Sequence, residues 1–376
     1  MDKGRNFLMQ LGESLFDIGY LALVIALGIR LLLENSKEAK LFGIMAILLG
    51  VGDSFHLLPR VISHFSPGGF EAHTFALSWG KFVTSITMTI FYVLYYYFYR
   101  KQSGDYDNKK KILVYALAII RIILVAMPQN NWGGAKESYQ WGIYRNIPFL
   151  IMGILLIIWS YKEKEKPGLK NMWWLILLSF AFYIPVVLFA DKYPAVGALM
   201  MPKTLAYLFI VVFGFKYFAG QFRASSLLAT SFTMLVMGIF AGAFSREFTK
   251  YYGFDGDTYL KLIHTHTLAL GFLALMTIYL LIKNFDEEYI LPLKKAYHTY
   301  ITGFTFTIVT MFVKGIFTVV SDGVDTINLS AISRISGLGH IIITVGIIWL
   351  MYELYKLETG SSFGNKLEDK KGLAIN

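Results

Sequence analysis

Four histidines of this chain lie within long apolar stretches, where an imidazole is costly to bury. His264 and His266 belong to the stretch IHTHTLALGF, His56 belongs to GDSFHLLPR, and His340 belongs to GLGHIIITVG. Imidazole nitrogens bind metal ions and haem iron, form hydrogen bonds and exchange protons near neutral pH. These four residues are therefore the first candidates for chemistry.

The spacing of the histidines limits what they can bind together. Successive residues of an α-helix are rotated by about 100°, so His264 and His266 point about 200° apart and cannot both bind one metal ion on a regular helix. The pair is suited to two neighbouring centres, or to one ligand and one hydrogen-bond partner. Asp53 and Arg60 share a helical face with His56. Asp53 could fix the tautomer of a ligating imidazole, or the three residues could form a structural ion pair.

Charged residues near the ends of apolar stretches extend this candidate site. Arg60 ends one stretch, and Arg246 and Glu247 end another. Arginine binds carboxylates, such as the propionates of haem, through two parallel hydrogen bonds. We therefore assign Arg60 and Arg246 as candidate cofactor-binding residues, although both could lie among lipid headgroups instead. Asp53 and Glu247 are the candidate supports for the ligating side chains.

The composition identifies the surroundings of these residues. Of 376 residues, 56% are hydrophobic, and the mean hydropathy is +0.53. Apolar stretches of about 20 residues recur, and each can cross a hydrocarbon core about 30 Å thick as a helix. The chain has no cysteine, which excludes disulfides, thiolate nucleophiles, cysteine-bound iron–sulfur clusters and covalent c-type haem. The net charge of +10 is concentrated in loops, so membrane topology explains it and it indicates no nucleic-acid partner.

We predict an all-α polytopic protein of the inner or plasma membrane with about eleven transmembrane helices. The spans are approximately 14 to 34, 40 to 62, 78 to 99, 111 to 127, 146 to 161, 171 to 190, 200 to 218, 226 to 245, 258 to 282, 298 to 320 and 332 to 355. Loops after odd-numbered spans carry about 20 Lys and Arg residues, and the opposite side carries about 11. The positive-inside rule therefore predicts an outer N-terminus and a cytoplasmic C-terminus.

These spans divide into two predicted modules and a tail. Residues 1 to 222 form a seven-helix module, residues 223 to 356 form a four-helix module with the His-x-His pair, and residues 357 to 376 form a cytoplasmic tail. His264 and His340 lie about six and eight residues into parallel spans, roughly 9 to 12 Å deep. His56 reaches the same outer half from an antiparallel span. Three helices are therefore expected to bring imidazoles to one layer, unless each histidine only forms a packing hydrogen bond.

The C-terminal third resembles a known family. The runs SREFTKYYGFDGDTYLKLIHTHTLALGFL, MFVKG and GLGHIIITVG, within residues 226 to 355, resemble an uncharacterised four-span bacterial membrane family. More distantly, His264-x-His266 is similar to the late helix of haem–copper oxidase subunit I and of NnrS-type membrane proteins. That resemblance implies that His264 and His266 serve different haems and that His56 matches a second-span ligand. The chain has no adjacent His-His pair and no His-Pro-Glu-type motif, so the resemblance does not extend to a copper centre.

The first seven spans suggest a second comparison. They are similar to seven-helix membrane hydrolases of the ceramidase and adiponectin-receptor kind, which hold zinc with three histidines, Asp and Ser. Asp53 and Ser54 fit these residue types, but these spans carry one histidine at depth, His56. A zinc site would therefore need histidines of the C-terminal module as well.

These observations favour a protein that binds haem b, or less readily another metal, for electron transfer or for redox or gas sensing. The expected axial ligands are His340 and either His264 or His266, with His56 as a third ligand or a partner. The expected partners are the lipid bilayer and a quinone or other redox partner. One alternative is a zinc-dependent lipid hydrolase in which Asp53 is the general base. Another is a metal-free transporter or receptor for a small solute, in which buried charges line the path.

Overall fold

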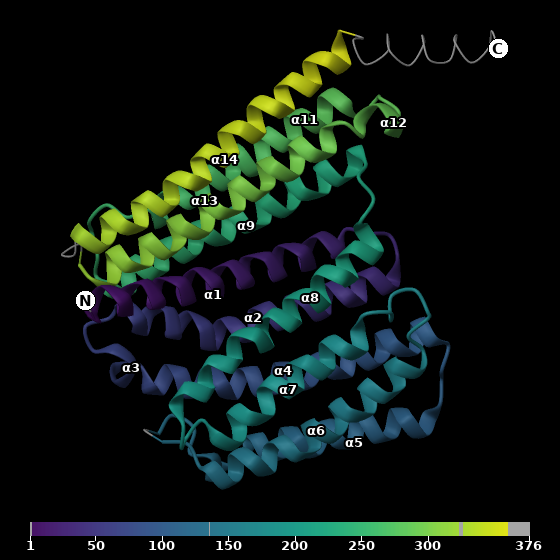
Figure 1. Ribbon diagram of the computed structural model, residues 1–376, viewed down its shortest axis with the longest axis vertical. Helices are drawn as coiled ribbons and strands as arrows, with labels where there is room; N and C mark the ends of the chain where they lie inside the picture. The colour runs from purple at the N-terminus through teal and green to yellow at the C-terminus, as the bar shows by residue number, and fades with distance from the viewer. Residues whose placement is uncertain (1, 135, 323–325, 360–376) are drawn as a thin grey trace. The chain divides into compact units, whose positions relative to one another are not determined.

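The computed structural model describes residues 2–134, 136–322 and 326–359, and these residues form helices and loops without any strand. Figure 1 shows the helices, most of which are long. Ten of those in the described part are long and apolar enough to cross a membrane. A helix satisfies its backbone hydrogen bonds within itself, which hydrocarbon requires. The predicted class, an all-α multi-pass membrane protein, is therefore confirmed. The predicted tail lies outside the described residues from residue 360 onward.

The chain divides into two compact units. The N-terminal unit is Phe16–Gly220, and the C-terminal unit combines Met1–Leu15 with Gln221–Asn376. The first helix, α1 (Asp2–Leu32), therefore contributes residues to both units. His56 belongs to the N-terminal unit, whereas His264, His266 and His340 belong to the C-terminal unit.

Long helices joined by short loops make up the N-terminal unit. After α1, these elements are α2 (Lys37–Phe65), α3 (Gly69–Ala72), α4 (Thr74–Ser103), α5 (Asn108–Ala126), the 3-10 turn η1 (Pro128–Asn130), α6 (Tyr139–Lys162), α7 (Met172–Phe189), the 3-10 segment η2 (Pro194–Leu199) and α8 (Met200–Ala219); α1 itself is Asp2–Leu32. The predicted span from 146 began too late. Ser138 caps α6 by accepting a hydrogen bond from the Trp141 amide, so the helix begins at Tyr139 and Pro148 lies inside it.

Helix α5 differs from the other long helices. It corresponds to the predicted fourth span, but it is not one of the ten candidate spans. Its sequence, NKKKILVYALAIIRIILVA, carries three lysines at its start and Arg121 in its interior. Arg121 is 2% exposed, whereas Ile112, Ile119 and Ile123 are exposed. The charge of Arg121 therefore faces the interior of the unit, and the outer face of α5 is apolar.

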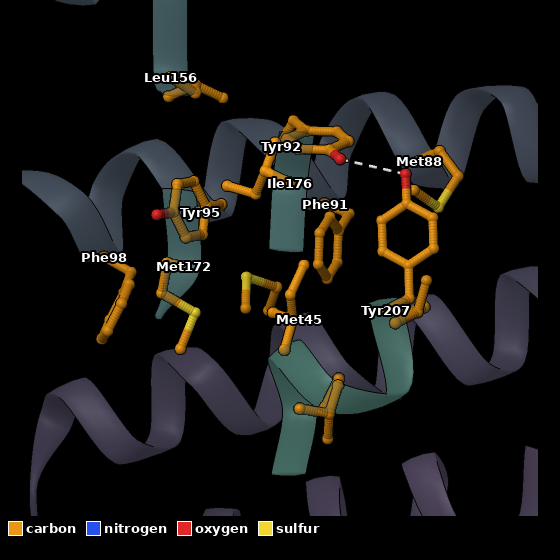
Figure 2. Packing of buried hydrophobic residues seen from close by; sticks show 14 of the residues in the cluster. Met45, Met88, Phe91, Tyr92, Tyr95, Phe98, Leu156, Met172, Ile176 and Tyr207 are labelled. Atoms are coloured by element: carbon orange, nitrogen blue, oxygen red, sulfur yellow. Dashed lines mark hydrogen bonds between the residues drawn. The ribbon is translucent and has the colours of Figure 1, made fainter. Parts of the chain in front are cut away.

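The core of the N-terminal unit is rich in aromatic side chains. Tyr92, Tyr95 and Phe91 of α4 pack with residues of α6, α7 and α8, as Figure 2 shows. Buried hydroxyl groups in this core are paired. Tyr92 and Tyr207 form a hydrogen bond of 3.0 Å, drawn as a dashed line in Figure 2, and Tyr92 also lies 3.2 Å from the Ser179 hydroxyl. Pairing removes most of the cost of burying polar groups in an apolar core.

The C-terminal unit is built mainly from antiparallel helices that lie side by side in Figure 1. Its elements after residue 220 are α9 (Ala224–Tyr252), α10 (Leu260–His266), the π-helix η3 (Thr267–Leu273), α11 (Ala274–Ile282), α12 (Glu287–Ile290), α13 (Leu293–Val320) and α14 (Thr326–Glu358). Leu260 lies opposite Gly315 of α13, and Gly271 lies opposite Phe304. The continuous segment of α10, η3 and α11 therefore runs antiparallel to α13.

Glycines bring α14 very close to α13. A Cβ atom added to Gly303 would lie 2.4 Å from the Ile343 nitrogen, and one added to Gly346 would lie 2.5 Å from the Tyr300 Cα atom. Gly339 similarly lies against Thr307. Small residues allow this close approach, which is typical of helix pairs in membranes. The contacts also establish that α14 runs antiparallel to α13, and therefore parallel to α10.

The predicted span over 258 to 282 corresponds to the continuous helical segment Leu260–Ile282, but its central part, Thr267–Leu273, is π-helical and not a regular α-helix. Two carbonyls of this segment receive hydrogen bonds from neighbouring helices. The Tyr300 hydroxyl donates to Leu270 at 2.8 Å, and the Ser231 hydroxyl donates to Phe272 at 2.9 Å. Side chains of α9 and α13 thus stabilise backbone groups of the wider helix. Such segments occur often at functional sites, and this one follows His266 directly.

Candidate functional site

Two histidines of the C-terminal unit have the same local arrangement. The Nδ1 atom of His266 donates a hydrogen bond of 2.9 Å to the Leu262 carbonyl, and Nδ1 of His340 donates one of 3.1 Å to the Ser336 carbonyl. A carbonyl can only accept, so Nδ1 carries the proton in both neutral rings. The Nε2 atom then carries a free lone pair. Metal-binding histidines are commonly oriented by such a bond.

Lys314 connects the helices that carry these two residues. It lies on α13, is 7% exposed, and donates a hydrogen bond of 2.6 Å to the hydroxyl of Ser333 on α14. Its ammonium group also lies 3.6 Å from the centre of the Tyr259 ring, which directly precedes α10. Ser333 and Tyr259 therefore point to the same place beside α13.

His266 lies two helical turns after Tyr259, on the same face of its helix, and His340 lies two turns after Ser333 on the same face of α14. Each histidine follows its counterpart by seven residues, a step that advances a helix by about 10 Å and rotates it by only about 20°. Because α10 and α14 are parallel, both steps lead in the same direction. The two imidazoles therefore lie on the same side of α13 as the Lys314 bridge.

The levels of the two histidines along α13 also agree. Leu260 is opposite Gly315 and Gly271 is opposite Phe304, which places His266 close to the level of Val309. Gly339 is opposite Thr307, so His340 lies about one residue beyond that level. The difference is roughly 3 to 5 Å at 1.5 Å per residue. His266 is half-buried and His340 is exposed, so the ring of His340 is open to a cofactor, to lipid or to a partner.

His264 faces another direction. Its Cβ atom lies 3.5 Å from the position of a Cβ built on Gly242 of α9, and its Nδ1 atom is buried without a hydrogen-bond partner. Its Nε2 atom lies 3.3 Å from the hydroxyl of Thr265. His264 and His266 thus have different neighbours, as their rotation about the helix axis predicts. Of the pair, it is His266 that shares a side of α13 with His340.

On α2, Asp53 does not form the hydrogen bond to His56 that would support His56 as a metal or haem ligand. Asp53 accepts a hydrogen bond of 2.7 Å from the Tyr20 hydroxyl, and Arg60 lies 3.8 Å from Asp17. His56 lies beside the backbone of Leu77, and its Nδ1 atom is buried without a partner. The hydrogen bond of Asp53 to Tyr20 thus takes the place of the bond to His56 that a supporting carboxylate would form.

Arg246 and Glu247 lie at the surface of the C-terminal unit. They form an ion pair of 2.7 Å with each other, and their side chains are 81% and 58% exposed. A pair with this exposure contributes little to stability, because water screens it. Their assignment to a cofactor site stays a prediction.

Within residues 2–134, 136–322 and 326–359, no group of three or more His, Asp or Glu residues is arranged to hold a metal ion. A zinc site with three protein ligands needs such a group. Two axial imidazoles are enough for haem. The C-terminal unit offers one imidazole from each of two helices, His266 and His340.

Tyr259 and Ser333 could not be assigned to this site from the sequence. Lys314 is recognisable as a charge within an apolar span, but neither of its neighbours is charged. The available signal is the repeat of seven residues that separates Tyr259 from His266 and Ser333 from His340. This repeat indicates a shared site only when α10 and α14 are known to pack on α13.

The C-terminal part of the chain matches a family model. Residues 225–357 match the model of a family described as "Protein of unknown function (DUF2871)". This range corresponds to the predicted resemblance of the C-terminal third to an uncharacterised family, which is confirmed. No curated protein and no solved structure matches the chain. Nothing in these comparisons supports the expected similarity to haem–copper oxidases or NnrS-type proteins.

Proposed function

We propose that the C-terminal unit binds one haem b, with the Nε2 atoms of His266 and His340 as its axial ligands. The observation that carries this proposal is the hydrogen-bonding pattern that the two rings share. Each gives its Nδ1 proton to a backbone carbonyl, each leaves Nε2 free, and both lie on one side of α13 at similar levels. A neutral imidazole with an oriented Nδ1 proton is the form that binds iron.

Lys314 supports the same proposal through its charge. Haem b carries two propionates, and an ammonium group in an apolar region favours a carboxylate nearby. Lys314 lies about two turns from the histidines on the same side of α13, and its neighbours Ser333 and Tyr259 carry no charge. Lys314 is thus a candidate partner for a propionate in addition to Arg246, which the sequence suggested.

The proposed role is electron transfer or redox sensing in a cell membrane. A haem with imidazole at both axial positions exchanges one electron without an open position for substrate. The residues of this chain hold the ring, orient the imidazoles and exclude water from the apolar side. A quinone or another redox protein is the proposed electron partner, and the inner or plasma membrane is the proposed location.

The test is the absorption spectrum of the purified full-length protein, oxidised and then reduced with dithionite. The cells that express it are supplied with a haem precursor. We expect a Soret band and sharp α and β bands after reduction, and about one iron per chain. His266→Ala and His340→Ala should each abolish the sharp bands. His264→Ala is the matched control and should keep them, because His264 faces α9.

Two results would contradict the proposal. One is a colourless, monodisperse protein, and the other is a haem spectrum that both His266→Ala and His340→Ala leave unchanged. A colourless protein that contains about one zinc ion would favour the lipid hydrolase instead. Removal of that zinc with a chelator should then abolish hydrolysis.

A further inference from the structure

A second unusual feature lies in the N-terminal unit, apart from the histidines. Arg121 of α5 is 2% exposed, and its Nε and Nη1 atoms are buried without a hydrogen-bond partner. In the described part of the chain, no ion pair or hydrogen bond joins the side chain of Arg121 to another residue. Its guanidinium carbon lies 3.2 Å from the centre of the Phe149 ring, which covers the group but neutralises no charge. Arginine does not lose its proton in proteins, so this charge needs a partner.

A second buried cation lies close to Arg121. Lys203 of α8 is 9% exposed, and its ammonium group lies 5.1 Å and 5.4 Å from the ring centres of Tyr183 and Tyr207. The Tyr183 ring in turn lies 6.1 Å from the Phe149 ring, on which Arg121 stacks. Lys203 interacts electrostatically with Arg121 and with Asp53. One aromatic cluster therefore carries both cations.

The acidic side chains nearby do not neutralise this cluster. Asp53 is the carboxylate that attracts the ammonium group of Lys203, and Asp53 also accepts a hydrogen bond from the Tyr20 hydroxyl. The neighbouring Arg145 is already paired, at 3.0 Å, with Glu137. Two cations and one carboxylate leave a net charge of +1. A single monovalent anion would balance it.

We propose that the N-terminal unit binds one small monocarboxylate between Arg121 and Lys203. A planar guanidinium donates two parallel hydrogen bonds to the two oxygens of a carboxylate, whereas a halide ion offers a single acceptor atom to both N–H groups. The rings of Phe149, Tyr183 and Tyr207 surround the two cations and make their environment apolar, which strengthens their attraction for an anion. The hydroxyls of this cluster are already bonded, Tyr183 to Asn146 and Tyr207 to Tyr92, so the free donors belong to the cations.

Both cations lie near the ends of their helices, on one side of the unit. Arg121 is five residues before the end of α5 at Ala126, and Lys203 is the fourth residue of α8. The distance to the helix ends is therefore only about 5 to 8 Å. We expect a carboxylate to enter the site from this side of the unit.

The experiment is calorimetric titration of the purified full-length protein with benzoate in a low-salt buffer. Benzamide serves as the neutral analogue, and chloride serves as the inorganic anion. We expect one benzoate per chain and no measurable binding of benzamide. Arg121→Gln and Lys203→Gln should each weaken benzoate binding about tenfold or more, because each removes a charge-assisted contact. Arg30→Gln is the matched control, since Arg30 is also buried but is paired with Glu34 at 2.5 Å.

Several outcomes would overturn the proposal. These are absence of benzoate binding in folded wild-type protein, equal binding of benzamide, and unchanged affinity in both Arg121→Gln and Lys203→Gln. Chloride binding as tight as that of benzoate would overturn the assignment to carboxylates. Size-exclusion chromatography and circular dichroism identify a variant that does not fold, and the other variant then decides the outcome.

Discussion

At the scale of single residues, Asp105 shows how the loop between α4 and α5 is held. Lys110 donates a hydrogen bond to its carboxylate, and this contact holds the pKa of Asp105 below its ordinary value. The amide of Asp107 also donates to it, at 3.1 Å, as does the Tyr99 hydroxyl, at 3.2 Å. All three donors favour the ionised form.

This arrangement predicts a pH-dependent contribution to stability. The pKa of an Asp carboxyl in the unfolded chain is about 3.9, and the pKa of Asp105 is lower in the folded state. The ionised carboxylate therefore stabilises the fold at pH values above about 3.9. This stabilisation is lost as the pH falls through the folded-state pKa. Asp105→Asn should lower the free energy of unfolding at pH 7 by about 1 kcal/mol or less, since the pair is partly exposed. The difference from wild type should shrink below about pH 4. Thermal unfolding of wild type and Asp105→Asn at pH 7 and below about pH 4 measures this difference in stability. A difference of the same size at the two pH values would contradict this account. Lys110→Met should reproduce the loss.

At the scale of helices, the contact between α13 and α14 depends on glycines that have no room for a side chain. Gly346→Ala would place a methyl group 2.5 Å from the Tyr300 Cα atom, so the helices must move apart. We expect a loss of about 1 to 3 kcal/mol in the stability of the C-terminal unit, as for other overpacked sites. The proposed haem site should weaken with it, because His340 lies on α14.

Gly337→Ala is the matched control for this substitution. Gly337 is on the same helix, and nothing lies within 4 Å of a Cβ atom added there. Alanine favours a helix over glycine by roughly 0.5 to 1 kcal/mol, so this variant should be as stable as wild type or more so. Chemical or thermal unfolding of the two variants in detergent gives the comparison. Equal stability of Gly346→Ala and Gly337→Ala would mean that the helices do not pack as described.

The helices themselves could be predicted from the sequence, but their neighbours could not. Apolar stretches of about 20 residues identify crossing helices because the thickness of the bilayer sets their length. No comparable rule relates Lys314 to Ser333 and Tyr259, which are neutral and belong to two other elements. Likewise, the π-helix after His266 depends on hydroxyls from Ser231 and Tyr300, far away in sequence. The depth of a histidine in the membrane follows from its position within its own helix. The choice of His266 over His264 as the partner of His340 depends on how α10 packs on α9 and α13, which the sequence does not show.

At the scale of the whole molecule, α5 decides the topology. It has 19 residues, which span about 28 Å and so nearly match the hydrocarbon core. Its charges do not oppose crossing, because Lys109, Lys110 and Lys111 lie at its start and Arg121 faces the interior. Its exposed isoleucines suit lipid. We therefore expect α5 to cross the membrane, as the sequence predicted for residues 111 to 127.

The absence of cysteine from the chain allows a direct test, because any introduced thiol is unique. Glu71 lies before α5, Asp257 lies between α9 and α10, and both are exposed. If α5 and the ten candidate spans all cross, Glu71→Cys and Asp257→Cys are on the same side of the membrane, and Glu165→Cys is on the other. The positive-inside rule places the first two outside. A membrane-impermeant maleimide should then label them in intact cells, and should label Glu165→Cys only after the cells are opened. Labelling of Glu71→Cys but not of Asp257→Cys in intact cells would mean that α5 does not cross, since one crossing fewer reverses every loop that follows it.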